Sequence, residues 1–119
     1  MTMRALVTGG AGFIGSHLVE GLLNRGDTVR VLDDFSTGYR GNLAPFKNDI
    51  EIIEADLRDI DQMKEAVSGM DWIFHLAGFI SVPQSLVDPE SCFSVNVNGT
   101  VNMLEVARIP VSLEAPVGD

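Results

Sequence analysis

The sequence is poor in the features that mark secreted and disulfide-bonded proteins. Its 119 residues include one cysteine, Cys92, so no intrachain disulfide can form. No histidine lies near Cys92 in the sequence, and we interpret it as a small buried apolar residue rather than a nucleophile. The amino terminus, Met1-Thr2-Met3-Arg4, leads directly into an apolar run without the pattern of a signal peptide. A cytoplasmic location is therefore expected.

Positive charge and long apolar runs are also scarce. Lysine and arginine number 8 against 17 aspartates and glutamates, which gives a formal net charge of -9. No basic patch of the kind that nucleic acid requires is visible, so we expect no nucleic-acid partner. No apolar run approaches the roughly 20 residues that span a bilayer, so no membrane partner is expected either. An anionic ligand would have to be held by backbone amides and helix dipoles rather than by lysines.

Glycine, in contrast, forms an ordered cluster near the amino terminus. A short apolar run leads into Thr8-Gly9-Gly10-Ala11-Gly12-Phe13-Ile14-Gly15, and an apolar-periodic stretch follows it. This is the strand, glycine-rich turn and helix of a dinucleotide-binding fingerprint. Gly9 allows the tight turn, Gly12 lets the backbone approach a pyrophosphate, and Gly15 lets the helix pack close to the strand. A tight turn without a ligand is the alternative for these glycines on their own.

The rest of the sequence alternates between predicted strands and helices. Gly26 fits the end of the first helix, and the Asp59–Gln62 spacing fits the start of the second. We expect Ile14, Leu18 and Leu22 to form the buried stripe of the first helix. Strands are predicted at Met3–Thr8, Thr28–Asp33, Ile50–Ala55 and Asp71–Ala77, and helices at Phe13–Arg25, after Asp59 and from Pro89. This alternation indicates parallel βαβ units with right-handed crossovers.

An acidic residue closes the second predicted strand. Asp33 follows Gly15 by 18 positions, where the acidic side chain of a dinucleotide fold meets the adenosine ribose. Each hydrogen bond to such a charged acceptor contributes about 1.5–3 kcal/mol. Asp34 adds to the repulsion of a 2′-phosphate, so NAD is favoured over NADP. A solvated aspartate at a strand end is the alternative for Asp33 by itself.

Other candidate ligand contacts follow the later strands at the same edge of the predicted sheet. Asp56 is positioned to accept from an adenine amino group and Leu57 to cover the ring, with helix capping near Asp59 as the alternative. His75-Leu76-Ala77-Gly78 ends the fourth strand and leaves room for the nicotinamide side. We interpret His75 as a buried, neutral, structural histidine. Neither His75 nor His17 has the partners of a metal site, and none is predicted.

Together these motifs resemble a known family. The glycine turn, the Asp33-Asp34-Phe35-Ser36-Thr37-Gly38 loop, Asp56-Leu57, His75-Leu76-Ala77-Gly78 and Asn96-Val97-Asn98-Gly99-Thr100 resemble the extended short-chain dehydrogenase/reductases. The similarity is greatest to the NAD-dependent epimerase/dehydratase branch, especially UDP-glucose 4-epimerases. It covers about residues 3–108. We therefore predict an α/β Rossmann-type, doubly wound parallel sheet in the order 3-2-1-4, with residues 1–108 as the NAD-binding domain and 109–119 as an irregular tail.

The resemblance also implies particular contacts. Ile80 stands where many 4-epimerases carry a lysine near the nicotinamide. The helix from Pro89 often joins a dimer-forming four-helix bundle in the family, so a homodimer is compatible with this sequence. Counting the glycines, the predicted cofactor-binding residues are Gly9, Gly12, Phe13, Ile14, Gly15, Asp33, Asp34, Phe35, Ser36, Thr37, Gly38, Asp56, Leu57, Leu76, Ala77, Gly78, Phe79, Ile80 and Asn96.

The catalytic residues of the family have no counterpart in these 119 residues. The family carries a Ser/Thr on a fifth strand and a Tyr-x-x-x-Lys on the next helix. Tyr39 is the single tyrosine here, no lysine follows Lys64, and residues 109–116 resemble a loop rather than a fifth strand. We expect no catalytic residue in this chain and a nucleotide sugar as substrate of the complete enzyme. The open hypotheses are the NAD-binding portion of a nucleotide-sugar epimerase or dehydratase, a non-catalytic dinucleotide-binding module, and a non-functional truncated gene product.

Overall fold

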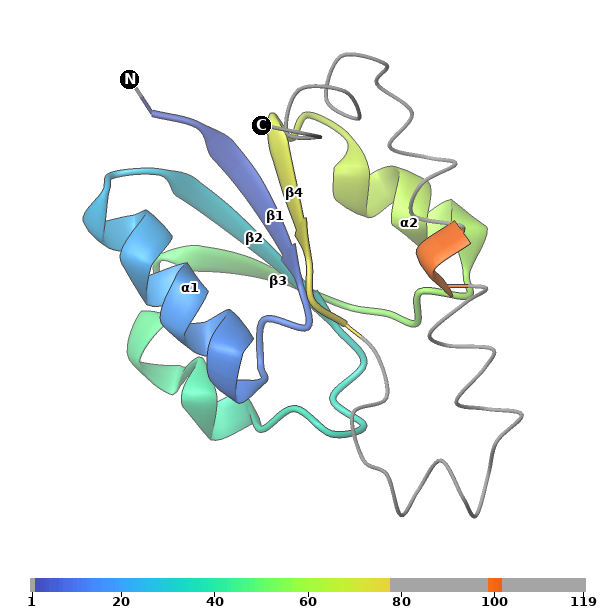
Figure 1. The fold of residues 1–119 in the computed structure, drawn as a ribbon, viewed down its shortest axis with the longest axis horizontal. Helices are drawn as coiled ribbons and strands as arrows, with labels where there is room; N and C mark the ends of the chain where they lie inside the picture. Colours follow the sequence, from blue (N-terminus) through green and yellow to red (C-terminus); the bar gives the residue numbers. More distant parts are fainter. Residues whose placement is uncertain (1, 78–98, 102–119) are drawn as a thin grey trace, which may run out of the picture.

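A computed structural model describes residues 2–77 and 99–101 of the chain (Figure 1). The predictions for Gly78, Phe79, Ile80 and Asn96, for the helix from Pro89 up to residue 98, and for the tail lie outside the described residues. The described strands are β1 (Arg4–Thr8), β2 (Thr28–Asp33), β3 (Ile50–Glu54) and β4 (Trp72–His75). The helices are α1 (Phe13–Asn24) and α2 (Ile60–Val67), with 3-10 turns η1 (Arg40–Asn42) and η2 (Ala44–Phe46).

The four strands form one parallel sheet in the order β3-β2-β1-β4, which confirms the predicted order. β1 lies between β2 and β4, so that Val7 pairs with both Val31 and Phe74. β1 and β3 are each one residue shorter than predicted, and β4 is shorter by one residue at its start and two at its end. β2 has the predicted bounds. Because all strands run in one direction, the segments that follow β1, β2, β3 and β4 meet at the carboxyl edge of the sheet.

The two faces of the sheet are covered by different helices: α1 lies on one side and α2 on the other (Figure 1). Successive side chains of a strand point to opposite faces. Ala5 and Val7 of β1 therefore pack on the α1 side, and Leu6 packs on the α2 side. The α1-side cluster contains Ala5, Val7, Ala11, Val19, Leu22, Val29, Val31 and Leu43. The α2-side cluster contains Leu6, Leu32, Ala55, Leu57, Met63 and Ala66.

The predicted stripe of α1 is wrong in its first turn. Ile14 is 70% exposed, and the buried positions of the helix are Gly15, Ser16, Val19 and Leu22. The cause lies in the glycine turn, because the backbone of Gly9 and Gly10 packs against Gly15. With Gly15 facing that turn, the preceding residue is rotated by about 100° around the helix and faces away from the sheet.

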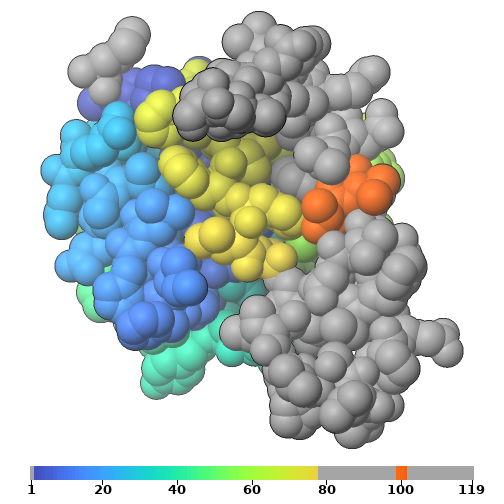
Figure 2. Space-filling model, viewed as in Figure 1, coloured from blue at the N-terminus to red at the C-terminus, as the bar shows by residue number. Residues whose placement is uncertain are grey.

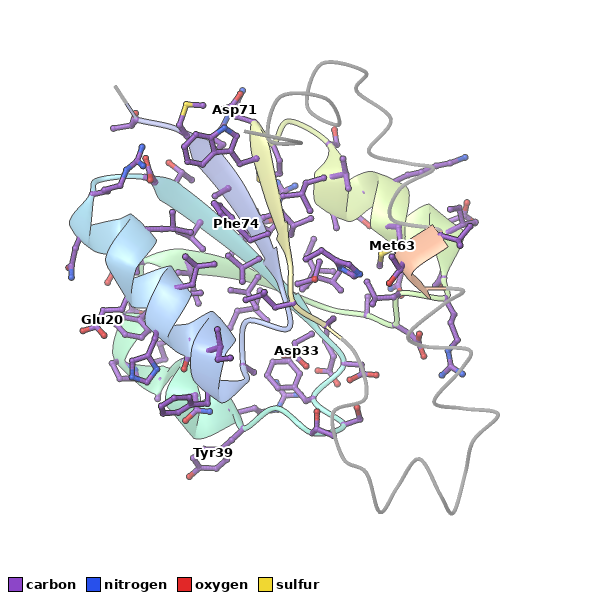
Figure 3. All side chains as sticks on the ribbon, viewed as in Figure 1. Glu20, Asp33, Tyr39, Met63, Asp71 and Phe74 are labelled. Carbon is purple, nitrogen blue, oxygen red and sulfur yellow. The ribbon has the colours of Figure 1, made fainter. Side chains whose placement is uncertain are left out.

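The second helix begins as its sequence indicates. The Asp59 side chain accepts from the backbone amides of Asp61 and Gln62, at 3.1 and 3.2 Å, which confirms Asp59 as the cap of α2. Met63 of α2 is fully buried and points toward the sheet (Figure 3). β4 is an edge strand of the described sheet, and its Ile73 packs against the same cluster as Met63. Its residues, in yellow, lie at the surface in Figure 2. The side chain of Trp72, at the start of β4, is 38% exposed.

Candidate functional site

The glycine turn packs so closely that three of its positions, Gly9, Gly10 and Gly15, leave no room for a side chain; a Cβ on Gly10 would lie 2.6 Å from Val31 Cγ1. Gly9 has a φ of +72°, and a Cβ there would lie 2.8 Å from the Ala77 nitrogen. A Cβ on Gly15 would lie 2.2 Å from the Gly9 carbonyl oxygen. Gly12 differs, since the nearest described atom to its Cβ position is that same oxygen, at 3.4 Å. Gly9 and Gly15 thus build the turn, and the open side of Gly12 leaves room for another molecule.

Helix α1 begins at this open side with unpaired backbone donors. Gly12 is the N-cap and supplies no capping side chain. The amide of Ser16 donates to the Gly12 oxygen at 2.9 Å, so the amides of Phe13, Ile14 and Gly15 precede the first helical hydrogen bond. These amides and the positive end of the helix dipole favour an anion. The side chains of Phe13 and Ile14 are 75% and 70% exposed beside them.

Asp33 joins the end of β2 to the glycine turn (Figure 3). Its Oδ2 accepts from the Ala11 amide at 2.9 Å, and its Oδ1 accepts from the Phe35 amide at 2.8 Å. Asp33 is 7% exposed, so the alternative of a solvated strand-end aspartate is wrong. A carboxylate has about four lone-pair sites, and each oxygen of Asp33 retains capacity for a further donor.

The loop after β2 packs onto the same turn. Asp34 Oδ1 accepts from the amide and the hydroxyl of Ser36, at 2.9 and 2.8 Å. A Cβ on Gly38 would lie 2.7 Å from the Ala11 Cβ and 2.9 Å from Asp33 Oδ2, so this approach also requires glycine. The Tyr39 amide donates to the Ala11 oxygen at 3.1 Å, while the Tyr39 side chain is 70% exposed and points away from the sheet (Figure 3).

The segment between β2 and β3 also contains the 3-10 turns η1 and η2. Within η1, the Asn42 side chain donates from Nδ2 to the Ala11 oxygen at 2.8 Å. Between the two turns, Leu43 is 2% exposed and belongs to the α1-side cluster. The loop is therefore anchored both to the glycine turn and to the core.

Asp56 and Leu57 follow β3 at the carboxyl edge. Asp56 Oδ1 accepts from the Arg58 amide and from Arg58 Nε, at 2.8 and 2.9 Å. These hydrogen bonds lower the pKa of Asp56. Asp59 and not Asp56 caps α2, so the capping alternative for Asp56 is wrong. Leu57 is 4% exposed within the α2-side cluster, against Gly99. Contact of either residue with an adenine stays a prediction.

A hydrogen-bonded network joins β1 to the end of β4. The buried Thr8 hydroxyl accepts from the amides of Leu76 and Ala77, at 3.0 and 3.2 Å. It also lies 2.8 Å from His75 Nδ1, and His75 Nε2 lies 3.0 Å from the Thr100 hydroxyl. Because two amides fill the acceptor sites of Thr8, its proton is directed to Nδ1, and Nε2 of the neutral ring donates to Thr100.

Burial lowers the pKa of His75 and favours this neutral ring, as the sequence analysis predicted. The histidine thereby connects three segments: β1, β4 and residues 99–101. Leu76 and Ala77, which are predicted ligand contacts, are positioned by the hydrogen bonds from their amides to the Thr8 hydroxyl.

No clustering of three or more metal-ligating side chains occurs within residues 2–77 and 99–101. In the same residues, no helix has the length and apolarity to cross a membrane.

Sequence reasoning missed one charged pair beside Asp33. The Arg40 guanidinium carbon lies 3.9 Å from the centroid of the Phe35 ring, and its Nη2 donates to Glu54 Oε1 at 2.5 Å. Glu54 is the register partner of Asp33 on the adjacent strand. The two charges are 14 residues apart, and no local periodicity links them. The parallel pairing of β2 with β3 was the available signal, because it aligns the ends of these strands.

A strand, a glycine turn, a helix with open amides and a buried acid at the end of the next strand define a Rossmann-type α/β domain. The family model of GDP-mannose 4,6 dehydratase matches residues 6–115, and the chain belongs to this family. The resemblance to NAD-dependent epimerases and dehydratases is thereby confirmed.

Among curated relatives, the chain is 46% identical over 115 residues to UDP-glucose 4-epimerase of Mycolicibacterium smegmatis, covering 90% of this chain and 35% of the relative. It is 38% identical over 107 residues to UDP-N-acetyl-alpha-D-glucosaminuronate decarboxylase of Bacillus cytotoxicus, covering 90% and 33%. The chain thus spans about a third of the length of these relatives.

Solved structures show the same likeness. The UDP-glucose 4-epimerase of Thermus thermophilus in complex with NAD matches with a TM-score of 0.81 and 44% identity, over 89% of this chain and 34% of that one. The dTDP-glucose 4,6-dehydratase of Streptomyces venezuelae, with NAD bound, matches with a TM-score of 0.83 and 38% identity, over 88% and 35%.

Proposed function

We propose that this chain binds NAD and forms the cofactor-binding portion of a nucleotide-sugar epimerase or dehydratase. The observation that carries the proposal is the hydrogen bond from the Ala11 amide to Asp33 Oδ2, which joins residues 22 positions apart. It brings the buried acid beside the turn where α1 offers its open amides. Complexes of similar proteins with NAD support the choice of ligand.

The described residues suit the parts of a dinucleotide. A pyrophosphate would accept from the amides at the start of α1, over the open side of Gly12. The adenosine ribose would donate to the remaining acceptor sites of Asp33. Asp56 and Leu57 are assigned to the adenine, and Leu76 with Ala77 to the nicotinamide side. The further contacts predicted for Gly78, Phe79, Ile80 and Asn96 lie outside the described residues.

In a complete enzyme the bound dinucleotide would accept a hydride from a sugar carbon and return it. This chain would bind and orient that cofactor. The Asp33 carboxylate would hold the ribose, and the Thr8–His75 network would keep the backbone of Leu76 and Ala77 in place at the other end. The tyrosine and lysine that the family uses for proton transfer have no counterpart in these 119 residues. The sugar nucleotide as substrate, a homodimer through the helix from Pro89 and a cytoplasmic location stay predictions.

Titration calorimetry of the full chain with NAD and with NADP tests the proposal. We expect tighter binding of NAD, and Asp33→Ala should weaken it by about 1.5–3 kcal/mol. This variant also deprives two amides of an acceptor, so its unfolding is followed in parallel to separate binding from folding. Asp49→Ala, an exposed site at the amino end of β3, controls for the lost charge. Equal or tighter binding of NADP would contradict the ribose role of Asp33.

A further inference from the structure

An arginine lies beside the proposed ribose site, although the acids there disfavour a 2′-phosphate. The Arg40 guanidinium stacks on the Phe35 ring, and the Phe35 amide donates to Asp33 Oδ1 at 2.8 Å. Arginine recognises phosphate well, because its planar donors match two phosphate oxygens at once. A free guanidinium at this place would therefore attract the 2′-phosphate of NADP and weaken the preference that Asp33 creates.

The guanidinium of Arg40 is already paired with the carboxylate of Glu54. Its Oε1 accepts from Arg40 Nη2, and its backbone is the register partner of Asp33 in the β2–β3 pair. The ends of two neighbouring strands thus carry two acids in different environments. Asp33 is buried and bonded to backbone amides, whereas the side chain of Glu54 is 58% exposed and paired with Arg40, itself 62% exposed.

We propose that Glu54 is a specificity-determining residue: by holding Arg40 in an ion pair, it keeps this cation from binding the 2′-phosphate of NADP. The inference rests on the proposed function and adds a second source of NAD preference. Asp33 acts on the ribose directly, and Glu54 acts through Arg40. Since the pair is exposed, its strength is limited, and a phosphate would compete for Arg40 once the carboxylate is removed.

The test measures the ratio of the dissociation constants of NADP and NAD on the full chain. NAD binding is followed by calorimetry, and NADP is titrated in competition with bound NAD. We expect Glu54→Gln to shift the ratio toward NADP by about two- to five-fold, the range that an exposed ion pair supports. The shift should shrink as ionic strength rises, because screening weakens an exposed contact between guanidinium and phosphate.

Two further variants separate the role of Arg40 from a general change of charge. Glu51→Gln removes a carboxylate from the same strand, 60% exposed and paired with Arg30, and should leave the ratio unchanged. Adding Arg40→Gln to Glu54→Gln should return the ratio to that of the wild type. A gain that persists in the double variant, or an equal gain in Glu51→Gln, overturns the inference.

The outcomes also distinguish this inference from the proposed function on which it rests. If the wild-type chain binds neither dinucleotide, the proposed function is overturned and the inference falls with it. If the wild type prefers NAD and Glu54→Gln leaves the ratio unchanged, only the role of Glu54 is overturned. Thermal unfolding of each variant without ligand shows whether a changed ratio coincides with a changed fold.

Discussion

Replacing Gly15 by alanine tests the close packing of the glycine turn without any ligand. The new Cβ would lie 2.2 Å from the Gly9 carbonyl oxygen and 2.8 Å from the Gly10 Cα. Both are backbone atoms, and no flexible side chain can rotate away to relieve the contact. The Gly9 amide also donates to the Leu32 oxygen at 2.8 Å, which ties the turn to β2. The contact is therefore relieved only by moving the turn or the start of α1.

The magnitude follows from two opposing effects. Forcing an extra carbon into a packed site costs about 1–3 kcal/mol. Alanine also favours a helix over glycine by about 1 kcal/mol in a helix interior, and by less in the first turn, where Gly15 lies. We expect Gly15→Ala to lower the free energy of unfolding by about 1–2 kcal/mol. At roughly 4 °C per kcal/mol, this is a fall in Tm of about 4–8 °C.

The matched control is another glycine of the same helix. Among residues 2–77 and 99–101, no atom outside the adjoining helix backbone lies within 4 Å of a Cβ built on Gly21, so Gly21→Ala gains helix propensity without a clash. This variant should raise the free energy of unfolding by about 0.5–1 kcal/mol. Urea unfolding followed by circular dichroism measures both variants against the wild type. If Gly15→Ala were as stable as Gly21→Ala, the close contact between α1 and the turn would be refuted.

The network around Thr8 gives two further predictions. Thr8→Val removes the acceptor of the Leu76 and Ala77 amides and should lower the free energy of unfolding by about 1–3 kcal/mol, measured by urea unfolding, whereas the exposed Thr28→Val should change it by less than about 0.5 kcal/mol. The second concerns pH: because burial lowers the pKa of His75 in the folded chain, the unfolded chain binds more protons, so stability is full above pH 6.5 and falls as pH drops below it. Urea unfolding at pH 7.5 and 5.5 should show a smaller loss for His75→Gln than for the wild type, and equal losses would contradict a depressed pKa.

Much of the fold was predictable because its signals are local or periodic. The apolar runs before Thr8 and Asp33 gave strands β1 and β2, and Asp59 gave the start of α2. Alternation of strands with helices gave the parallel sheet. The exposed face of α1 was not predictable from periodicity, because Ile14 continues an apolar pattern at helical spacing. Ile14 is exposed because the backbone of the glycine turn packs against Gly15, so that Gly15 and not Ile14 faces the turn.

The candidate site was predictable in its residues but not in their mutual contacts. Motif spacing identified Asp33 but could not show its hydrogen bonds. In the structure, its carboxylate oxygens accept from the backbone amides of Ala11 and Phe35. The Arg40–Glu54 pair was not identified at all. An arginine in an irregular loop and a glutamate at a strand end are each ordinary surface residues. Their significance depends on strand register, which brings Glu54 beside Asp33 and is a property of the assembled sheet.

The glycine turn is held from three directions by hydrogen bonds that do not involve any ligand. The Gly9 amide donates to β2, the Ala11 amide donates to Asp33, and the Ala11 oxygen accepts from the amide of Tyr39 and the side chain of Asn42. A pyrophosphate would thus meet amides that are already oriented, and little ordering would be required on binding. The same contacts stabilise the fold. Variants that loosen the turn should therefore lose stability without ligand and affinity with it, whereas a change at Glu54 should alter cofactor preference with little effect on stability.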